Sequence, residues 1–138
     1  MFRYLWVAVL GPELGLFREP YQRFGHYNDE MLRAMRLVVD TGLHAYVWSR
    51  DQAIDYMLAH SAMSRKDATA EVERYIADPG QALAYKIGAL TLQRLRRESE
   101  RRLGERFDVR AFHQQVLDTG SIPLAVLEAK IAQWQAAR

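Results

Sequence analysis

The chain has 138 residues, of which 49% are hydrophobic and 26% charged, a balance that suits one globular domain with a real core. Its 19 basic and 17 acidic residues leave a net charge of only +2, which gives no support to nucleic acid as a partner. The absence of cysteine excludes disulfides and cysteine-based zinc sites, and no two of the four histidines stand at the spacing of an HExxH metal motif.

Residues 3–10, within the opening MFRYLWVAVLG, form a short apolar segment. The segment carries Arg3 early and lacks the small-residue cleavage pattern of a secretory signal peptide. No stretch of the sequence approaches the ~20 apolar residues that are needed to cross a membrane. We expect a short buried helix here, a cytoplasmic location and no membrane partner, with a cryptic targeting segment as the alternative.

Residues 11–27 hold three glycines and two prolines, which predicts an ordered, aromatic-rich loop. Asn28 is the expected N-cap of a long helix over about 29–47. Asp29 and Glu30 would then lie at the positive end of the helix dipole, where carboxylates are favourable.

Five more helices are predicted from their start and stop signals. SRDQ at 49–52 matches a capping box and begins a helix to about residue 60, while SRKD at 64–67 begins one to about residue 77. Asp78 followed by proline predicts an N-cap and the first residue of a long helix over about 79–103, with Gln81 at the third position. The last two helices are expected after Asp108 and after Ser121, to about residue 118 and to the C-terminus.

No strand-like alternation and no hairpin turn occurs in the sequence. The sequence therefore predicts an all-α fold, with about six helices in an irregular helical bundle. We expect a single domain over residues 1–138.

Arg36, Asp40 and His44 are spaced four residues apart, so they form one stripe along the predicted helix 29–47. One interpretation is an exposed ladder of charge pairs, each worth a few tenths of a kcal/mol. The other is an inward polar network or the floor of a cleft, because leucine and valine surround the stripe.

The stretch PGQALAYKIG at 79–88 sets a tyrosine and a lysine in a small, apolar run. Gln81 and Tyr85 share a helix face, and Lys86 lies about 100° away. A tyrosine hydroxyl can stabilise a developing oxyanion, and a lysine beside it can hold a carboxylate. Alternatively, Tyr85 packs in the core while Lys86 extends to water.

Residues 94–106, RLRRESERRLGER, contain six arginines and three glutamates. The glutamates stand four residues from arginines, as in Arg94–Glu98 and Arg96–Glu100, which is typical of a solvated helix face. An RNA-binding stripe would need interleaved aromatic residues, and this segment has none.

Four segments together resemble the C-terminal portion of the DUF885 family, which are large, mostly helical proteins similar to zinc-dependent metallopeptidases. The segments are LGPELGLFREPYQRFG, RAMRLVVDTGLHAYVWSRDQAIDYM, VERYIADPGQALAYKIGALTLQRLR and ERFDVRAFHQQVLDTGSIPLAVLE. They follow one another in order from about Leu10 onward.

The resemblance implies zinc in intact relatives, but their zinc motifs, of the types HEAxPGHH and EGWxLYxE, lie upstream of the matched region. Laying LYxExLG over residues 5–11 puts Trp6 in place of the tyrosine and Ala8 in place of the second glutamate. The first glutamate would fall at about Met1. We therefore expect no metal ligand and no cofactor in this chain.

The resemblance also implies that five residues face a catalytic cleft in intact relatives, as substrate-binding or oxyanion-stabilising groups. Asp40 would belong to the supporting structural network. No catalytic set is complete in this chain. The five candidates are Arg36, His44, Gln81, Tyr85 and Lys86.

Three functions remain open. The first is a truncated or remnant metallopeptidase-like domain without hydrolase activity of its own, which associates with itself or with a partner. The second is a helical interaction module that binds a peptide or small ligand between Tyr85 and His44. The third is a subunit of a zinc peptidase that a zinc-bearing partner polypeptide completes.

Overall fold

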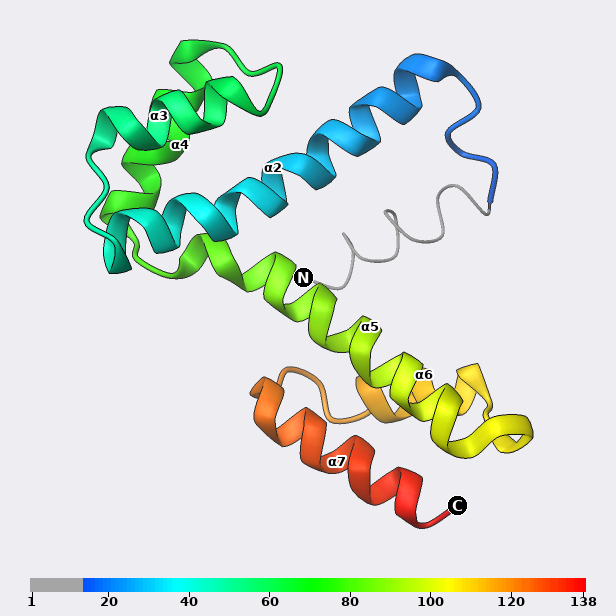
Figure 1. Ribbon diagram of the computed structural model, residues 1–138. Coiled ribbons are helices and arrows are strands. Elements are labelled where there is room, and N and C mark those ends of the chain that lie inside the picture. Colours follow the sequence, from blue (N-terminus) through cyan, green and yellow to red (C-terminus); the bar gives the residue numbers. More distant parts are fainter. Residues whose placement is uncertain (1–13) are drawn as a thin grey trace. The chain divides into compact units, whose positions relative to one another are not determined.

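The computed structural model describes residues 14–138, which contain six α-helices and no strand, so the predicted all-α fold is confirmed (Figure 1). The described residues fall into two compact units that meet between Ile87 and Gly88. The prediction of one domain stays a prediction. The expected helix over 3–10 lies outside the described residues. No helix in the described part of the chain is long and apolar enough to cross a membrane.

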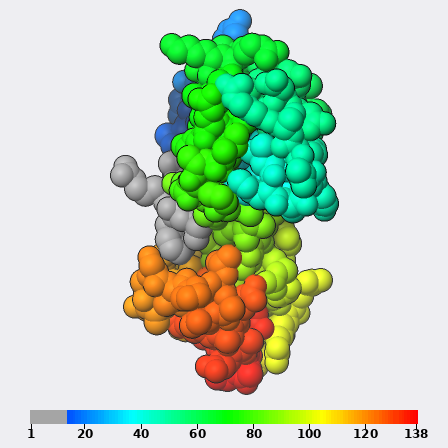
Figure 2. Space-filling view, turned by 90° about the vertical axis from the view of Figure 1, so that its left-hand side faces the viewer, coloured from blue at the N-terminus to red at the C-terminus, as the bar shows by residue number. Residues whose placement is uncertain are grey.

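The first unit contains three α-helices and a short 3-10 helix. They are α2 (Pro20–Ala45), α3 (Arg50–Ala59), α4 (Arg65–Ala77) and η1 (Gln81–Leu83), after which α5 (Ala84–Leu103) begins. Figure 2 shows α3 and α4, in cyan-green and green, side by side on one face. In Figure 1 both helices lie beside the cyan C-terminal half of α2.

Helix α2 begins eight residues before the predicted N-cap, so the prediction of a loop through residue 27 is wrong from Pro20 onward. Proline interrupts the interior of a helix, but at the first helical position its missing N–H costs nothing. Gln22 accepts hydrogen bonds at its side-chain oxygen from the Glu19 N–H, 3.2 Å, and the Arg18 N–H, 3.0 Å, and so fixes the helix start. Asn28 is therefore no cap, and its two acidic neighbours lie inside the helix.

The caps of α3 and α4 are confirmed. Ser49 accepts from the Gln52 N–H and Ser64 from the Asp67 N–H, which satisfies donors that the first turn leaves open. The predicted helix start at Asp78 is wrong, because Asp78 ends α4 instead. The chain then turns through Gly80, whose φ of +83° favours glycine, into η1 and α5.

The core of the first unit joins α2, α3, α4 and η1. Each large apolar side chain that is fully buried there contributes roughly 1.5–3 kcal/mol relative to exposure. The buried members are Met35, Val39, Ala53, Ile54, Met57, Ala68, Val72, Tyr75 and Ala82.

The second unit is formed by most of α5, a 3-10 turn η2 (Gly104–Arg106), α6 (Val109–Leu117) and α7 (Leu124–Ala136). Asp108 caps α6 as predicted, since it accepts from two backbone N–H groups. Ser99 of α5 is buried and accepts a hydrogen bond from Gln135 of α7, 2.8 Å. The predicted pairs Arg94–Glu98 and Arg96–Glu100 are confirmed on the outer face of α5.

The turn from α2 to α3 depends on a close contact between Gly42 and Trp48. Trp48 donates its backbone N–H to the Gly42 carbonyl, 2.9 Å, and its ring lies against the Gly42 Cα. A Cβ at Gly42 would stand 2.5 Å from Cδ2 of that ring. The turn therefore requires glycine here, although the helical backbone itself does not.

We expect Gly42→Ala to lower the free energy of unfolding by about 1–3 kcal/mol, because the indole ring has to move from its place against α2. Urea unfolding followed by circular dichroism measures the change. Gly25→Ala is the control, since Gly25 lies in the same helix and the added Cβ meets no atom within 4 Å beyond the adjoining backbone of that helix. That change should be neutral or stabilise by up to about 1 kcal/mol. Equal stability of the two variants would contradict the proposed contact.

Candidate functional site

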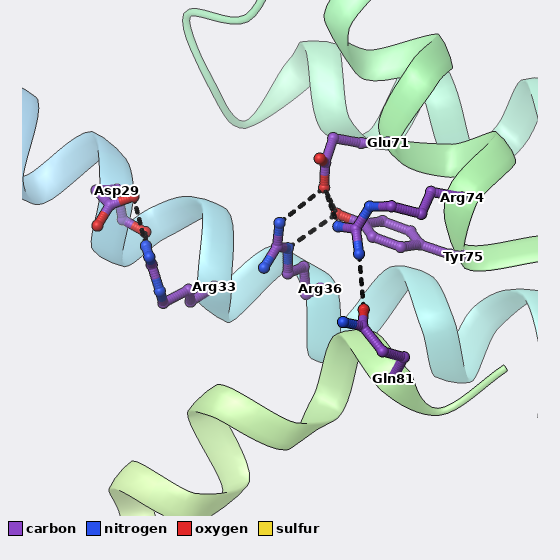
Figure 3. A network of polar contacts seen from close by, with 7 residues as sticks. All are labelled: Asp29, Arg33, Arg36, Glu71, Arg74, Tyr75 and Gln81. Carbon is purple, nitrogen blue, oxygen red and sulfur yellow. Dashed lines mark hydrogen bonds and ion pairs between the residues drawn. The ribbon is translucent and has the colours of Figure 1, made fainter. Parts of the chain in front are cut away.

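A network of polar side chains joins α2 to α4 around the carboxylate of Glu71 (Figure 3). One oxygen of this carboxylate, Oε2, accepts from Tyr75 Oη at 2.5 Å, Arg74 Nη2 at 2.8 Å and Arg36 Nη2 at 2.9 Å. Arg36 also donates from Nε to the Tyr75 hydroxyl, 3.1 Å. Arg74 donates from Nη1 to the side-chain oxygen of Gln81, 2.6 Å, which connects the network to η1.

The electrostatics of the network hold each group in one protonation state. Burial, and then the bond to Glu71, raise the pKa of Tyr75 to about 12. Burial alone would raise the pKa of Glu71, but hydrogen bonds from Tyr75, Arg74 and Arg36 outweigh it and hold that pKa below its usual value. Burial alone would lower the pKa of Arg36, whereas its bonds to Tyr75 and Glu71 raise it. At neutral pH the network is therefore an ion pair around a neutral phenol.

Asp40 lies one turn after Arg36 on α2 and is buried. Its two carboxylate oxygens accept from the backbone N–H of Gly80, at 3.2 and 3.1 Å. A carboxylate at the start of η1 satisfies an open backbone donor and interacts favourably with the positive end of the helical turn. Asp40 thus ties α2 to the segment that leads into α5.

His44 completes the stripe at the end of α2. Its Nε2 lies 3.1 Å from the backbone carbonyl of Tyr75. Because a carbonyl only accepts, Nε2 carries the proton and donates. Tyr75 lies in the last turn of α4, whose carbonyls have no partner within the helix, so His44 caps the C-terminal end of α4.

Tyr85 and Lys86 contact the first half of α2 rather than the Glu71 network. Lys86 forms an ion pair with Glu30, Nζ to Oε2 2.8 Å, and both side chains are partly shielded from water. The guanidinium of Arg33 lies 5.8 Å from the centre of the Tyr85 ring, within the range of a cation–π contact. Arg33 in turn pairs with Asp29 one turn earlier.

The structure brings the five candidates into two groups along α2. Arg36, His44 and Gln81 contact α4, whereas Tyr85 and Lys86 contact α2 farther toward its N-terminus. The contact points of Tyr85 and His44 on α2 are eleven residues apart, about 16 Å along the helix axis. Tyr85 and His44 therefore do not converge on one pocket, and a ligand site formed by that pair has no geometric support.

The stripe on α2 is not a ladder of charge pairs within the helix. Arg36 and the buried Asp40 make inward polar contacts, whereas the more exposed His44 reaches the end of α4. Sequence reasoning missed Glu71, Arg74 and Tyr75, which supply its partners. The spacing of these three on α4, at i, i+3 and i+4, places them on one face and was a local signal for a shared site. Nothing local indicates that α2 packs against that face.

Metal binding has no geometric support among the described residues. Within residues 14–138, no three histidine, aspartate or glutamate side chains come close enough together to hold a metal ion. The carboxylates of the site are already engaged, Glu71 by two arginines and a phenol and Asp40 by a backbone N–H. The described residues therefore do not fit the zinc that the family resemblance implies.

The fold and the site define an all-α protein in which one long helix carries polar ties to two later segments of the chain. The model of the DUF885 family, bacterial proteins of unknown function, matches residues 5–131. The chain therefore belongs to the DUF885 family. No protein with a curated description matches it.

The chain is similar to the crystal structure of the "putative lipoprotein" from Colwellia psychrerythraea, with 43% sequence identity and a TM-score of 0.89. The similarity covers 97% of this chain and 23% of the Colwellia protein. The chain thus spans about a quarter of the length of that relative.

The raised pKa of Tyr75 predicts a loss of stability at high pH. The unfolded chain releases this proton near the ordinary tyrosine pKa of about 10, whereas the folded chain retains it to about pH 12. The stabilisation is therefore complete below about pH 10 and is lost as the pH rises to about 12.

Tyr75→Phe removes this titration. Between about pH 10 and pH 12 its free energy of unfolding should fall less than that of the wild type, by on the order of 2 kcal/mol. Urea unfolding across this pH range measures the difference. Tyr21→Phe, at a position that is 89% exposed, is the control and should follow the wild type. If the free energies of unfolding of Tyr75→Phe and the wild type fell in parallel with pH, the pKa of Tyr75 would not be raised by folding.

The Lys86–Glu30 pair should contribute modestly to stability. A double-mutant cycle with Lys86→Met and Glu30→Gln is expected to give a coupling energy of about 0.5–1 kcal/mol that decreases with added salt. The control is the Arg65–Asp55 pair, 3.2 Å apart with both side chains exposed, for which the coupling should be close to zero. Equal coupling in the two pairs would contradict the partial shielding of Lys86.

Proposed function

We propose that this chain is the C-terminal helical part of a larger metallopeptidase-like protein, that it forms one wall of the substrate cleft there, and that it has no hydrolase activity of its own. The observation that carries the proposal is the similarity to the Colwellia protein, which keeps this fold at 43% identity within a chain about four times longer. The family resemblance supplies the peptidase class.

In this proposal the zinc ligands belong to polypeptide outside residues 14–138. The zinc motifs of the family, HEAxPGHH and EGWxLYxE, precede the region that this chain resembles. Zinc, when bound in an intact protein, would polarise the scissile carbonyl and activate water. The residues of this chain would bind and orient the substrate on the other side of the cleft.

Tyr85 and Lys86 are the candidates for substrate contact. The ion pair with Glu30 is only partly shielded, so a substrate carboxylate can replace Glu30 at Lys86. Arg33 lies beside the Tyr85 ring but is paired with Asp29, so Lys86 is the group that would take the substrate carboxylate. The Tyr85 hydroxyl would donate to the substrate carbonyl oxygen as negative charge develops on it.

Arg36, His44 and Gln81 are positioning residues in this proposal. Their bonds hold α4 and η1 against α2 and so fix the start of α5, which carries Tyr85 and Lys86. Asp40 acts in the same way through Gly80. The network thus sets the geometry of the cleft wall without touching the substrate.

The purified chain alone should contain sub-stoichiometric zinc and should not hydrolyse a mixture of fluorogenic peptides, with or without added zinc. Elemental analysis and fluorescence measure the two outcomes. Stoichiometric zinc or zinc-dependent hydrolysis by the chain alone would overturn the proposal.

The DNA sequence upstream of the coding region tests where the rest of the protein comes from. A continuous reading frame with the two zinc motifs would place the chain in one long polypeptide. A separate neighbouring gene with those motifs would indicate a zinc-bearing partner that completes the peptidase in trans. A genome with neither motif nearby would count against both arrangements and favour a remnant that associates with itself.

A further inference from the structure

One side of α2 carries an uninterrupted row of uncharged residues. Their positions alternate between steps of four and three along the whole helix, which keeps them within one narrow stripe. We refer to these residues as the α2 seam. The seam consists of Pro20, Phe24, Tyr27, Met31, Ala34, Val38, Thr41 and Ala45.

The large residues of the seam are exposed. Phe24 is 59% exposed, Tyr27 66%, Met31 47% and Val38 40%. Scattered apolar residues are normal on a protein surface, but these four lie within about 60° of one another on the helix. They extend over fourteen residues, about 21 Å along the axis. The seam is therefore a continuous apolar surface.

The other two sides of α2 are already occupied. Met35 and Val39 face the core formed with α3 and α4. Glu30 and Arg33 face the start of α5, through Lys86 and Tyr85. The seam lies on the remaining side, about a quarter of a turn from the core positions.

The first half of α2 gains little stabilisation from the packing that the structure describes. No residue from Pro20 to Ala34 is fully buried, although this half carries both aromatic residues of the seam. A helical segment of this length is marginal in water unless an apolar face is covered. Covering the seam would supply the missing packing.

We propose that the α2 seam docks a second α-helix, which comes from the part of a DUF885 polypeptide beyond the quarter that this chain represents. The spacing of three and four residues fits a helix that crosses α2 at about 20°, with side chains interdigitating. The Colwellia protein keeps this fold at a TM-score of 0.89 while 23% of its length is matched, so the rest of that protein is available to cover the seam.

The seam also specifies the chemistry of its partner helix. The partner needs apolar residues at the same three-and-four spacing and no charge along its contact line, because a charge there would be buried without a counter-charge. Small residues fit opposite Phe24 and Tyr27. Larger aliphatic residues fit opposite Ala34 and Ala45, where the seam is shallow.

This inference rests on the proposed function for the source of the helix, but its test measures packing and binding and not catalysis. The Colwellia structure gives the first measurement. The residues that align there with Phe24, Tyr27, Met31 and Val38 should be buried by a helix outside the matched 23%. Exposure of those residues, or cover by a segment from within the matched region, would overturn the inference.

The second measurement uses this chain and a synthetic peptide with the sequence of that covering helix, labelled for fluorescence anisotropy. Met31→Lys combined with Val38→Lys should weaken binding of the peptide at least about tenfold, since two charges enter an apolar contact. Ile76→Lys is the matched control, because Ile76 is 44% exposed on α4 and outside the seam. It should leave binding unchanged.

Unfolding and light scattering of the same variants complete the experiment. Because the seam is exposed in the isolated chain, both variants should keep the stability of the wild type within about 0.5 kcal/mol. Equal binding by the two variants would overturn the inference. A wild-type dimer that the seam variant dissociates, and the control does not, would also overturn it, because a second copy would then be the occupant.

Discussion

The first unit depends on one half-buried carboxylate, that of Glu71, which pairs with arginine side chains and accepts from a buried phenol. A carboxylate that accepts three hydrogen bonds at a single oxygen keeps two arginines and Tyr75 in fixed positions, and these groups belong to two different helices. Removing any one donor or acceptor would leave a desolvated polar group without its partner, which costs more than the bond itself contributes. The relative position of α2 and α4 is therefore closely specified, and with it the position of the turn into η1 within the same unit.

Three successive turns of α2 each place one polar side chain against another element of the unit. Arg36 reaches Glu71 in the middle of α4, Asp40 reaches the turn before η1, and His44 reaches the end of α4. Each contact satisfies a group that would otherwise lose a hydrogen bond on burial. Residues that a catalytic interpretation would make reactive are thus largely engaged in holding helices together, and Tyr85 and Lys86 are themselves half-buried against α2.

Local signals predicted the fold well wherever the residues that form a feature are close in sequence. The caps at Ser49, Ser64 and Asp108 are of this kind, since each acts on donors two or three residues away. Pro20 shows the limit of such local prediction, because a proline can either interrupt a helix or begin one. Here it begins a helix, since the side chain of Gln22 accepts from the Glu19 N–H at that end. The start of η1 shows another limit, because the carboxylate that accepts from Gly80 there comes from Asp40, forty residues earlier. The four-residue spacing of the stripe can be read from the sequence, but the element that it faces cannot. Its partners Glu71 and Tyr75 lie 35 and 31 residues away from Arg36 and His44 in the sequence.

His44 has a further property that follows from its contact with α4. The backbone carbonyl of Tyr75 accepts from Nε2, so the ring has one preferred orientation at the end of α4. The carbonyl that it reaches is one that the last turn of α4 leaves without a partner inside the helix. The last turn of α2 thus supplies the group that ends α4, so the two helices end beside each other at a defined pair of residues.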